Sequence, residues 1–227
     1  MRIRAVIFDL GGVVFESPLR FIRDYERRHG LPENLVARVV GGYGGDQGAW
    51  QRLERGELAL PAFCEELDRE VRALGAVMST ADLMRQMAEL HDVRPAMLAA
   101  IRKLRQAGLR VAALTNNWVT HDGYDERMRP LREEFHAFVE SCKVGLRKPD
   151  PRIYAIACER LGVPPSASVF LDDIGGNLKV ARGLGMTTIK VGDPLEALRE
   201  LSSVVGIDLL SGNADVPGTG RSTKSSC

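Results

Sequence analysis

Acidic side chains that could bind a metal ion or attack an electrophile occur at two places, each directly after a short apolar run. Asp9 follows the run 4–8 and precedes two glycines, which allow a tight turn and a close approach to a ligand. Asp172 and Asp173 follow the run 168–171, and adjacent carboxylates repel each other strongly at low dielectric unless a cation lies between them. Mg²⁺ is the economical choice, because it prefers oxygen ligands. Asp9 alone could equally cap a helix, so its interpretation depends on what lies beside it.

A hydroxyl group and an ammonium group at two further positions could bind a phosphate. Thr115 follows the run 110–114, where its hydroxyl and the next backbone amides can donate hydrogen bonds to a phosphate. Lys148 lies just before a predicted helix, where its ammonium can neutralise a carboxylate and the oxygens of a phosphoryl group. Either residue alone is weak evidence, since lysines often precede helices on protein surfaces. Together with the acids they indicate a site for a phosphate.

The runs that carry these residues are short and rich in β-branched side chains, which is typical of buried strands. We expect strands at 4–8, 110–114, 168–171 and 187–191. Helical patterns lie between them at 95–107 and at 151–161, where Asp150 is the expected N-cap and Gly162 the terminator. Strands that alternate with helices predict an α/β fold, a Rossmann-like doubly wound parallel sheet with its ligand site at the carboxyl ends of the strands.

The segment 16–91 interrupts this alternation, because it contains only amphipathic helical patterns. These patterns cover 19–29, 33–40, 61–74 and 80–90. We therefore expect a core domain of residues 1–15 and 92–211, with 16–91 inserted after the first strand as a helical cap domain. Residues 41–48 form a glycine-rich loop that matches no nucleotide-binding fingerprint, and we interpret it as a flexible connection. Residues 212–227 lack apolar periodicity and are predicted to be disordered.

The bulk composition excludes several classes of protein. Lys and Arg total 31 against 30 for Asp and Glu, so the net charge of +1 provides no field that would favour nucleic acid. No window approaches the roughly 20 apolar residues of a membrane helix, and no basic leader precedes the first strand. The four cysteines lie far apart, which argues against a zinc site or a disulfide framework. We expect a cytoplasmic protein without a nucleic-acid partner or membrane insertion, whose oligomeric state the sequence leaves open.

The order strand then Asp9, strand then Thr115, Lys148, and strand then Asp172 and Asp173 resembles the four-part signature of the haloacid dehalogenase (HAD) superfamily. Three segments, 114–118, 140–145 and 169–179, resemble the N-terminal phosphatase domain of soluble epoxide hydrolase and the related amino-terminal segment of an acyl-CoA dehydrogenase family member. The resemblance covers nearly all of residues 1–210. No G-x-S-x-G elbow follows in the sequence, so epoxide hydrolysis is not implied.

The resemblance implies a Mg-dependent phosphatase that hydrolyses small organic or lipid phosphate monoesters through an aspartyl-phosphate intermediate. In this scheme Asp9 is the nucleophile, and Thr115 and Lys148 are the other catalytic residues. The metal ligands would be Asp9, the carbonyl of Gly11, Asp172 and Asp173. The substrate, a small-molecule phosphate ester, would contact Thr115, Asn116, Lys148 and Asn177.

The sequence departs from the phosphatase signature at Gly11, where the usual motif has a second Asp that protonates the leaving group and then activates water. General acid–base catalysis contributes about 10²- to 10⁴-fold in rate. We therefore expect low activity toward simple alkyl phosphates and better activity toward esters with good leaving groups. Glu16, Asp46 and His121 are candidate replacements, but the sequence does not choose among them, and each is more commonly a surface residue.

Two alternative functions follow from the same gap. The chain could bind phosphate and Mg²⁺ as a weakly active or inactive regulatory module. It could also be a metal-independent haloacid dehalogenase, because a halide leaves without a proton. Asp172 and Asp173 would then lack a compensating cation, and Gly11 occupies a position that is aromatic in such dehalogenases.

Substrate specificity is expected to come from the helical cap, because an insertion after the first strand lies over the strand ends. An amphipathic helix followed by a turn is expected at 49–58. Trp50 and Trp118 could line a pocket for an apolar substrate, although a buried tryptophan is more common. The sequence does not identify the substrate.

Overall fold

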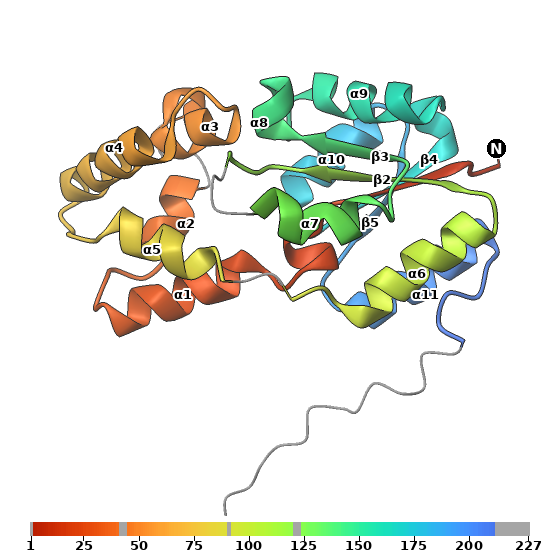
Figure 1. The fold of residues 1–227 in the computed structure, drawn as a ribbon, viewed down its shortest axis with the longest axis horizontal. Coiled ribbons are helices and arrows are strands. Elements are labelled where there is room, and N and C mark those ends of the chain that lie inside the picture. Colours follow the sequence, from red (N-terminus) through yellow and green to blue (C-terminus); the bar gives the residue numbers. More distant parts are fainter. Residues whose placement is uncertain (1, 41–44, 90–91, 120–123, 212–227) are drawn as a thin grey trace, which may run out of the picture.

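A five-stranded parallel sheet forms the centre of the protein, as seen in a computed structural model that describes residues 2–40, 45–89, 92–119 and 124–211 (Figure 1). The strand order is β3-β2-β1-β4-β5. The strands are β1 (Ala5–Phe8), β2 (Arg110–Thr115), β3 (Ala137–Glu140), β4 (Ser168–Asp172) and β5 (Thr187–Lys190). β1 pairs with β2 on one side and with β4 on the other. The chain therefore adds strands first on one side of β1 and then on the other, which is the arrangement of a doubly wound α/β fold. The predicted fold class is confirmed.

Strand β3 was not among the four strands predicted from the sequence. Its apolar run contains only Ala137, Phe138 and Val139 before Glu140, which is too short to distinguish from a loop by pattern. Pairing supplies what the pattern lacks, since Ala112 to Thr115 of β2 align in register with Ala137 to Glu140. Edge strands of this kind are defined by their neighbour more than by their own composition.

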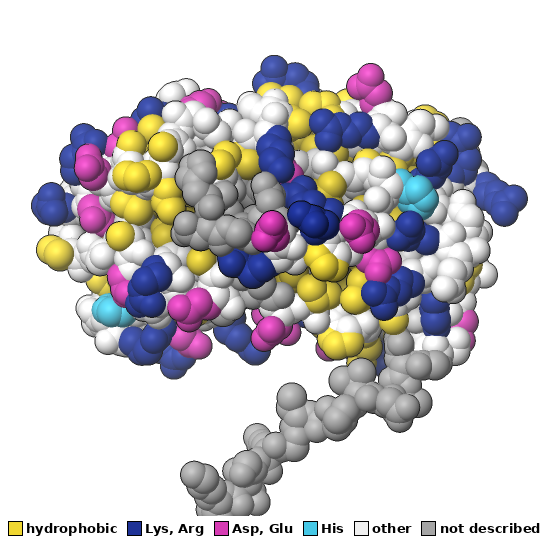
Figure 2. All heavy atoms as spheres, viewed as in Figure 1, with side chains coloured by type: hydrophobic (Ala, Val, Ile, Leu, Met, Phe, Trp, Pro, Cys, Tyr) yellow, Lys and Arg dark blue, Asp and Glu magenta, His cyan; other side chains and the backbone are white. Residues whose placement is uncertain are grey.

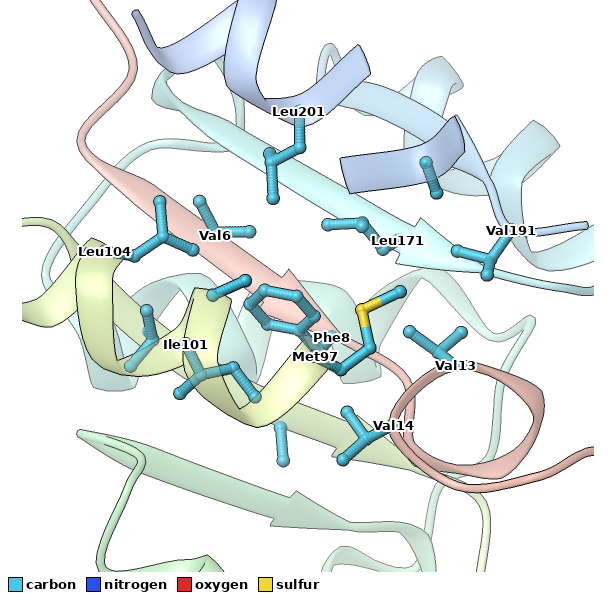
Figure 3. Packing of buried hydrophobic residues seen from close by; sticks show 14 of the residues in the cluster. Val6, Phe8, Val13, Val14, Met97, Ile101, Leu104, Leu171, Val191 and Leu201 are labelled. Atoms are coloured by element: carbon cyan, nitrogen blue, oxygen red, sulfur yellow. The ribbon is translucent and has the colours of Figure 1, made fainter. Parts of the chain in front are cut away.

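Successive side chains of β1 point to opposite faces of the sheet, and each face has its own hydrophobic cluster. Val6 and Phe8 belong to one cluster, and Ala5 and Ile7 to the other. The first face packs against α6 (Pro95–Gln106), α7 (Tyr124–Arg132) and α11 (Pro194–Val205), as the close view of Phe8, Met97 and Leu201 illustrates (Figure 3). The second packs against α9 (Pro151–Leu161) and α10 (Gly175–Gly183), while the one-turn α8 (Ser141–Val144) follows β3.

Helix α9 shows how local sequence defines the two ends of an element. The Asp150 carboxylate accepts a hydrogen bond from the Arg152 amide at 2.9 Å, Pro151 occupies the first turn, and Gly162 ends the helix at φ 65°. These are the N-cap, the bounds and the terminator that the sequence predicts. Helix α6 likewise begins at the predicted Pro95 and ends one residue earlier than expected.

The insertion between β1 and β2 is helical, as predicted, and has a hydrophobic cluster of its own. Its helices, which we call the inserted helices, are α1 (Pro18–Arg28), α2 (Leu35–Val40), α3 (Ala49–Glu54), α4 (Leu60–Ala73) and α5 (Thr80–Met87). They lie together at the end of the sheet toward which β1 runs (Figure 1). The chain leaves and re-enters the sheet region side by side, because Phe15 and Val93 form an antiparallel bridge.

Two predicted segments fall partly or wholly outside the described residues. Of the glycine-rich loop 41–48, residues 45–47 form a single 3-10 turn and 41–44 are not described. The tail 212–227 also lies outside the described part of the chain. Within that part, no helix is both long and apolar enough to cross a bilayer. Charges of both signs are interspersed on the face shown in Figure 2, in keeping with the net charge of +1.

Candidate active site

The carboxyl ends of three adjacent strands bring the predicted site residues together. Phe8 pairs with Leu171 of β4, and the Asp9 amide donates to the Leu171 carbonyl at 2.9 Å, so Asp9 and Asp172 leave the sheet side by side. Thr115 is the last residue of β2, the other neighbour of β1. Asp9, Thr115 and Asp172 are all buried.

Lys148 joins two of the acids. Its Nζ lies 2.8 Å from Asp9 Oδ1 and 2.8 Å from Asp172 Oδ2. Lys148 is 2% exposed, and Asp172 is fully buried. An ammonium so deeply buried is stable only beside negative charge, and here it has two carboxylates for one positive charge.

Asp172 is held from three directions. Its oxygens accept hydrogen bonds from the Ile174 amide at 2.7 Å and from Asn177 Nδ2 at 3.1 and 3.0 Å, in addition to Lys148. Asn177 lies on α10 and is itself fixed, because its carbonyl accepts from the Tyr154 hydroxyl at 3.0 Å. The Asn177 side-chain amide thus orients Asp172, a role distinct from the substrate contact expected from the sequence.

A third carboxylate completes an acidic cluster. Oxygens of Asp9, Asp172 and Asp173 lie within 4.8 Å of one another, the only group of its kind detected in the part of the chain that the structure describes. Asp173 is half-buried and accepts a hydrogen bond from Ser17 Oγ at 3.4 Å. Gly12 makes room for it, since an added Cβ at this positive-φ position would overlap the Asp173 carboxylate. Three acids facing one lysine leave this pocket with excess negative charge.

The electrostatics of Asp9 reflect that excess. Burial raises the pKa of Asp9 to about 8, with further increases from Asp172 and Asp173 that the nearby Lys148 ammonium only partly offsets. For Lys148, burial lowers the pKa but the two carboxylates outweigh it, so the net shift is upward. Burial also raises the pKa of Asp173, helped by the charge of Asp172. Asp9 and Asp173 would hold their charge more easily if another cation were present.

The loop after β2 is tied to the loop that carries Lys148. Asn116 Oδ1 accepts from the Lys148 amide at 2.8 Å, and Asn116 Nδ2 donates to the Lys148 carbonyl at 3.0 Å. The Thr115 hydroxyl donates to the Asn116 carbonyl at 3.4 Å, a long bond that leaves it free to exchange for a better acceptor. Direct contacts therefore bring together six of the predicted site residues: Asp9, Asn116, Lys148, Asp172, Asp173 and Asn177. Thr115 joins them through its bond to Asn116, and Gly11 is placed beside them only by its position two residues after Asp9.

One charged residue close to this site was missed by the sequence analysis. Glu54, at the end of α3, is 7% exposed and accepts from Trp50 Nε1 at 3.0 Å, from Asn116 Nδ2 at 3.3 Å and from Arg147 Nε at 2.6 Å. Its place on the buried face of a short amphipathic helix gave no signal, because the partners lie 62 and 93 residues away. Trp50 is buried in the cluster of the inserted helices, and its indole packs edge-on against Trp118.

The candidate replacements for an acid at position 11 differ in their surroundings. Glu16 is exposed, and a hydrogen bond from Arg94 lowers its pKa, which is the wrong direction for a proton donor. Asp46 is exposed on the 3-10 turn, and His121 lies outside the described residues. Gly11 itself has ordinary extended backbone angles, φ −66° and ψ 123°.

Comparison with known proteins agrees with this geometry. Acyl-CoA dehydrogenase family member 10 from Mus musculus is 39% identical over 220 residues, covering 95% of this chain and 20% of that protein. Bifunctional epoxide hydrolase 2 from Rattus norvegicus is 32% identical, covering 96% of this chain and 41% of that protein. The chain thus spans less than half the length of these two relatives. A phosphatase from Mycobacterium tuberculosis is 30% identical, covering 82% of this chain and 86% of that protein.

A solved structure shares the fold. A HAD-family enzyme from Bacteroides thetaiotaomicron, in complex with magnesium and inorganic phosphate, aligns with a TM-score of 0.59 and 23% identity over 84% of this chain and 96% of that one. Residues 3–185 match the haloacid dehalogenase-like hydrolase family, which confirms the resemblance read from the sequence motifs. The chain therefore belongs to the haloacid dehalogenase-like hydrolase family and has phosphatases among its relatives.

Proposed function

We propose that this protein is a Mg-dependent phosphatase of small organic or lipid phosphate monoesters, with Asp9 as the nucleophile. The observation that carries the proposal is the cluster of Asp9, Asp172 and Asp173 around the buried Lys148 at the carboxyl edge of the sheet. A carboxylate nucleophile, a cation-demanding acid pair and a buried ammonium are the parts that phosphoryl transfer requires, since that chemistry depends on positioning and charge neutralisation.

The residues present fit Mg²⁺. The donors are carboxylate oxygens gathered within 4.8 Å. Burial, helped by the neighbouring acids, raises the pKa of Asp9 and Asp173, so a bound cation would stabilise their charged forms. Asp9, Asp172, Asp173 and the Gly11 carbonyl would hold the ion. When bound, it supplies neutralisation of the carboxylates and polarisation of the phosphoryl oxygens.

The reaction follows from the residues at the strand ends. The Asp9 carboxylate forms a bond to phosphorus while the bond from phosphorus to the alkoxide or phenoxide leaving group breaks. Water then attacks the aspartyl-phosphate, which releases inorganic phosphate and restores the carboxylate. Lys148, the Thr115 hydroxyl and the Asn116 amide would hold the phosphoryl oxygens, while Asn177 keeps Asp172 in place.

The leaving group restricts the substrates. Position 11 has no side chain to protonate an alkoxide, so aryl phosphates, acyl phosphates and sugar 1-phosphates should react better than simple alkyl phosphates. We further propose that residues 16–91 act as a cap domain over a core of 1–15 and 92–211 and select the leaving group. The separate hydrophobic cluster of the inserted helices supports this division.

The test is steady-state hydrolysis of an aryl phosphate with Mg²⁺ and with chelator, by the wild-type protein and by Asp9→Asn. Turnover that needs Mg²⁺ and is abolished in Asp9→Asn is the expected result. Asp24→Asn, which changes a half-exposed acid on α1 that pairs with Arg27, serves as the matched control and should retain full activity. Turnover that persists in Asp9→Asn would refute the assigned nucleophile, and haloacid hydrolysis without metal would establish the dehalogenase alternative.

A binding role is the second candidate, because Gly11 removes the acid–base group while leaving the phosphate and metal ligands in place. It predicts that inorganic phosphate binds in a Mg-dependent manner while no ester is turned over. Calorimetric titration of phosphate with and without Mg²⁺, alongside the activity assay, separates the two functions.

A further inference from the structure

Glu54 stands out because the inserted helices place it, buried, against two loops of the sheet region. The carboxylate lies at the end of α3. Of its two partners in the sheet region, Asn116 directly follows β2 and Arg147 directly precedes Lys148. It is therefore a charged contact between the insertion and the loops that carry the phosphate ligands of the proposed function.

The turn after α3 fixes this contact in space. Gly56 has φ 73°, and an added Cβ there would lie 2.5 Å from the Cys142 carbonyl of α8, so the backbones approach as closely as glycine permits. Trp50, one turn before Glu54 on α3, donates its indole N–H to the other carboxylate oxygen at 3.0 Å. Both oxygens of Glu54 thus have fixed donors, and the side chain has little freedom.

The network continues from Glu54 to the catalytic lysine. Asn116 Nδ2 donates both to Glu54 and to the Lys148 carbonyl, while Asn116 Oδ1 accepts from the Lys148 amide. Arg147 is the residue before Lys148, and its guanidinium Nε is 2.6 Å from Glu54. Two covalently adjacent residues are therefore held by one carboxylate, one directly and one through Asn116.

The same contacts exclude another role. A general acid must present a proton to the leaving group, but both oxygens of Glu54 are already occupied by three donors, among them a guanidinium. Its hydrogen-bonding capacity points to orientation of its partners.

We propose that Glu54 is a positioning residue that couples docking of the inserted helices to the placement of Asn116 and Lys148, and so to phosphate binding. The proposal rests on the proposed phosphatase function for its effect on turnover. Its effect on phosphate binding and on the Lys148 amide does not depend on turnover.

The experiment compares Glu54→Ala and Glu54→Gln with Glu57→Gln, a matched control that removes an exposed acid from the same turn. The expected result for Glu54→Ala is a loss of about 10- to 100-fold in kcat/KM for an aryl phosphate, the range seen when a residue that orients ligands is removed. Inhibition by inorganic phosphate should weaken in parallel. Glu54→Gln keeps the volume and one acceptor, so it should lose less, and Glu57→Gln should match the wild type.

Hydrogen exchange at the Lys148 amide distinguishes positioning from general loss of stability. That amide donates to Asn116 Oδ1, so its exchange should accelerate in Glu54→Ala while amides of the central strands keep their protection. On an Arg147→Met background, Glu54→Ala should cost less than the product of the single effects, because the two side chains share one interaction.

Unchanged phosphate inhibition and unchanged Lys148 exchange in folded Glu54→Ala would overturn the proposal, as would an equal loss in Glu57→Gln. If Glu54→Ala does not fold, the isosteric Glu54→Gln decides by the same two measurements. If the wild type shows no turnover of any ester, the phosphatase function fails, and phosphate affinity by calorimetry together with Lys148 exchange still decides the role of Glu54.

Discussion

Restoring a carboxyl group at position 11 should convert a restricted enzyme into a more general one. The structure can accept Gly11→Asp, because the backbone has φ −66° and ψ 123°, which any residue adopts. An added Cβ would meet only Pro18 Cδ at 3.6 Å and Cγ at 3.8 Å, which is ordinary van der Waals contact. The change in the free energy of unfolding should therefore be less than about 1 kcal/mol.

The gain should depend on the leaving group. Burial, helped by the neighbouring carboxylates, raises the pKa of Asp9 and Asp173. A new carboxyl beside these acids should therefore keep its proton more readily than a free aspartate does, and could donate it. General acid catalysis at its lower bound gives about 10²-fold, equivalent to roughly 2.7 kcal/mol of transition-state stabilisation. An alkyl phosphate should gain that factor in kcat/KM, whereas an aryl phosphate, whose phenoxide leaves without a proton, should gain less than about tenfold.

The assay is kcat/KM for a matched alkyl and aryl phosphate in the wild type, Gly11→Asp and Gly11→Asn. The asparagine variant has nearly the same shape but no acidic proton to transfer to the leaving group, so its kcat/KM for the alkyl phosphate should not increase. Equal gains for both substrates, or a gain in Gly11→Asn, would refute the reasoning that a missing proton donor limits this enzyme. No gain in a folded Gly11→Asp that still binds phosphate would refute it as well.

Three further outcomes are expected. Gly12→Ala should weaken Mg²⁺ affinity at least about tenfold, because the added methyl group would displace the Asp173 carboxylate. Calorimetric titration with Mg²⁺ measures the affinity, and an unchanged value would contradict the prediction. Burial raises the pKa of Asp9 to about 8, and Mg²⁺ binds the ionised carboxylate, so Mg²⁺ affinity should rise with pH up to about 8 and then level off. Titrations of Mg²⁺ between pH 6 and 9 should show that protons are released on binding. An affinity that does not change with pH would exclude this linkage. Glu140→Gln should lower the free energy of unfolding by about 1.5–3 kcal/mol at pH 7. Burial raises the pKa of Glu140, yet hydrogen bonds from Arg132, Lys143 and Asn117 lower it to about 2. The stability from its charge is therefore present above pH 4.5 and disappears as pH falls toward 2. Urea denaturation of both proteins across that range should show the difference narrowing.

The sequence was informative where function depends on chain position alone. Asp9, Thr115 and Asp172 each follow a short apolar run, and parallel strands end at one edge, so the residues after them meet there whatever the details of packing. The bounds and caps of α9 were equally legible, because Asp150 and Gly162 act on their own helix through local hydrogen bonds and backbone geometry.

Other features depended on contacts between segments distant in the chain. Strand β3 forms because its residues pair in register with β2, and its three apolar residues were too few to predict a strand from the sequence. Glu54 acquires its meaning from Asn116 and Arg147, which only the docking of α3 brings within hydrogen-bond distance. The same holds for Asn177, whose amide is directed onto Asp172 by the packing of α10.

The sequence by itself therefore determined the family, the doubly wound sheet and the set of residues at its carboxyl edge. The tertiary structure decided which of those residues contact one another, that Asp9 and Asp172 share one buried lysine while Asp173 lies beside them, and that burial raises the pKa of Asp9 to about 8. The physical reason is that strand order follows from local patterns and rules of connection, whereas charge balance and side-chain orientation depend on the distances between groups far apart in the chain.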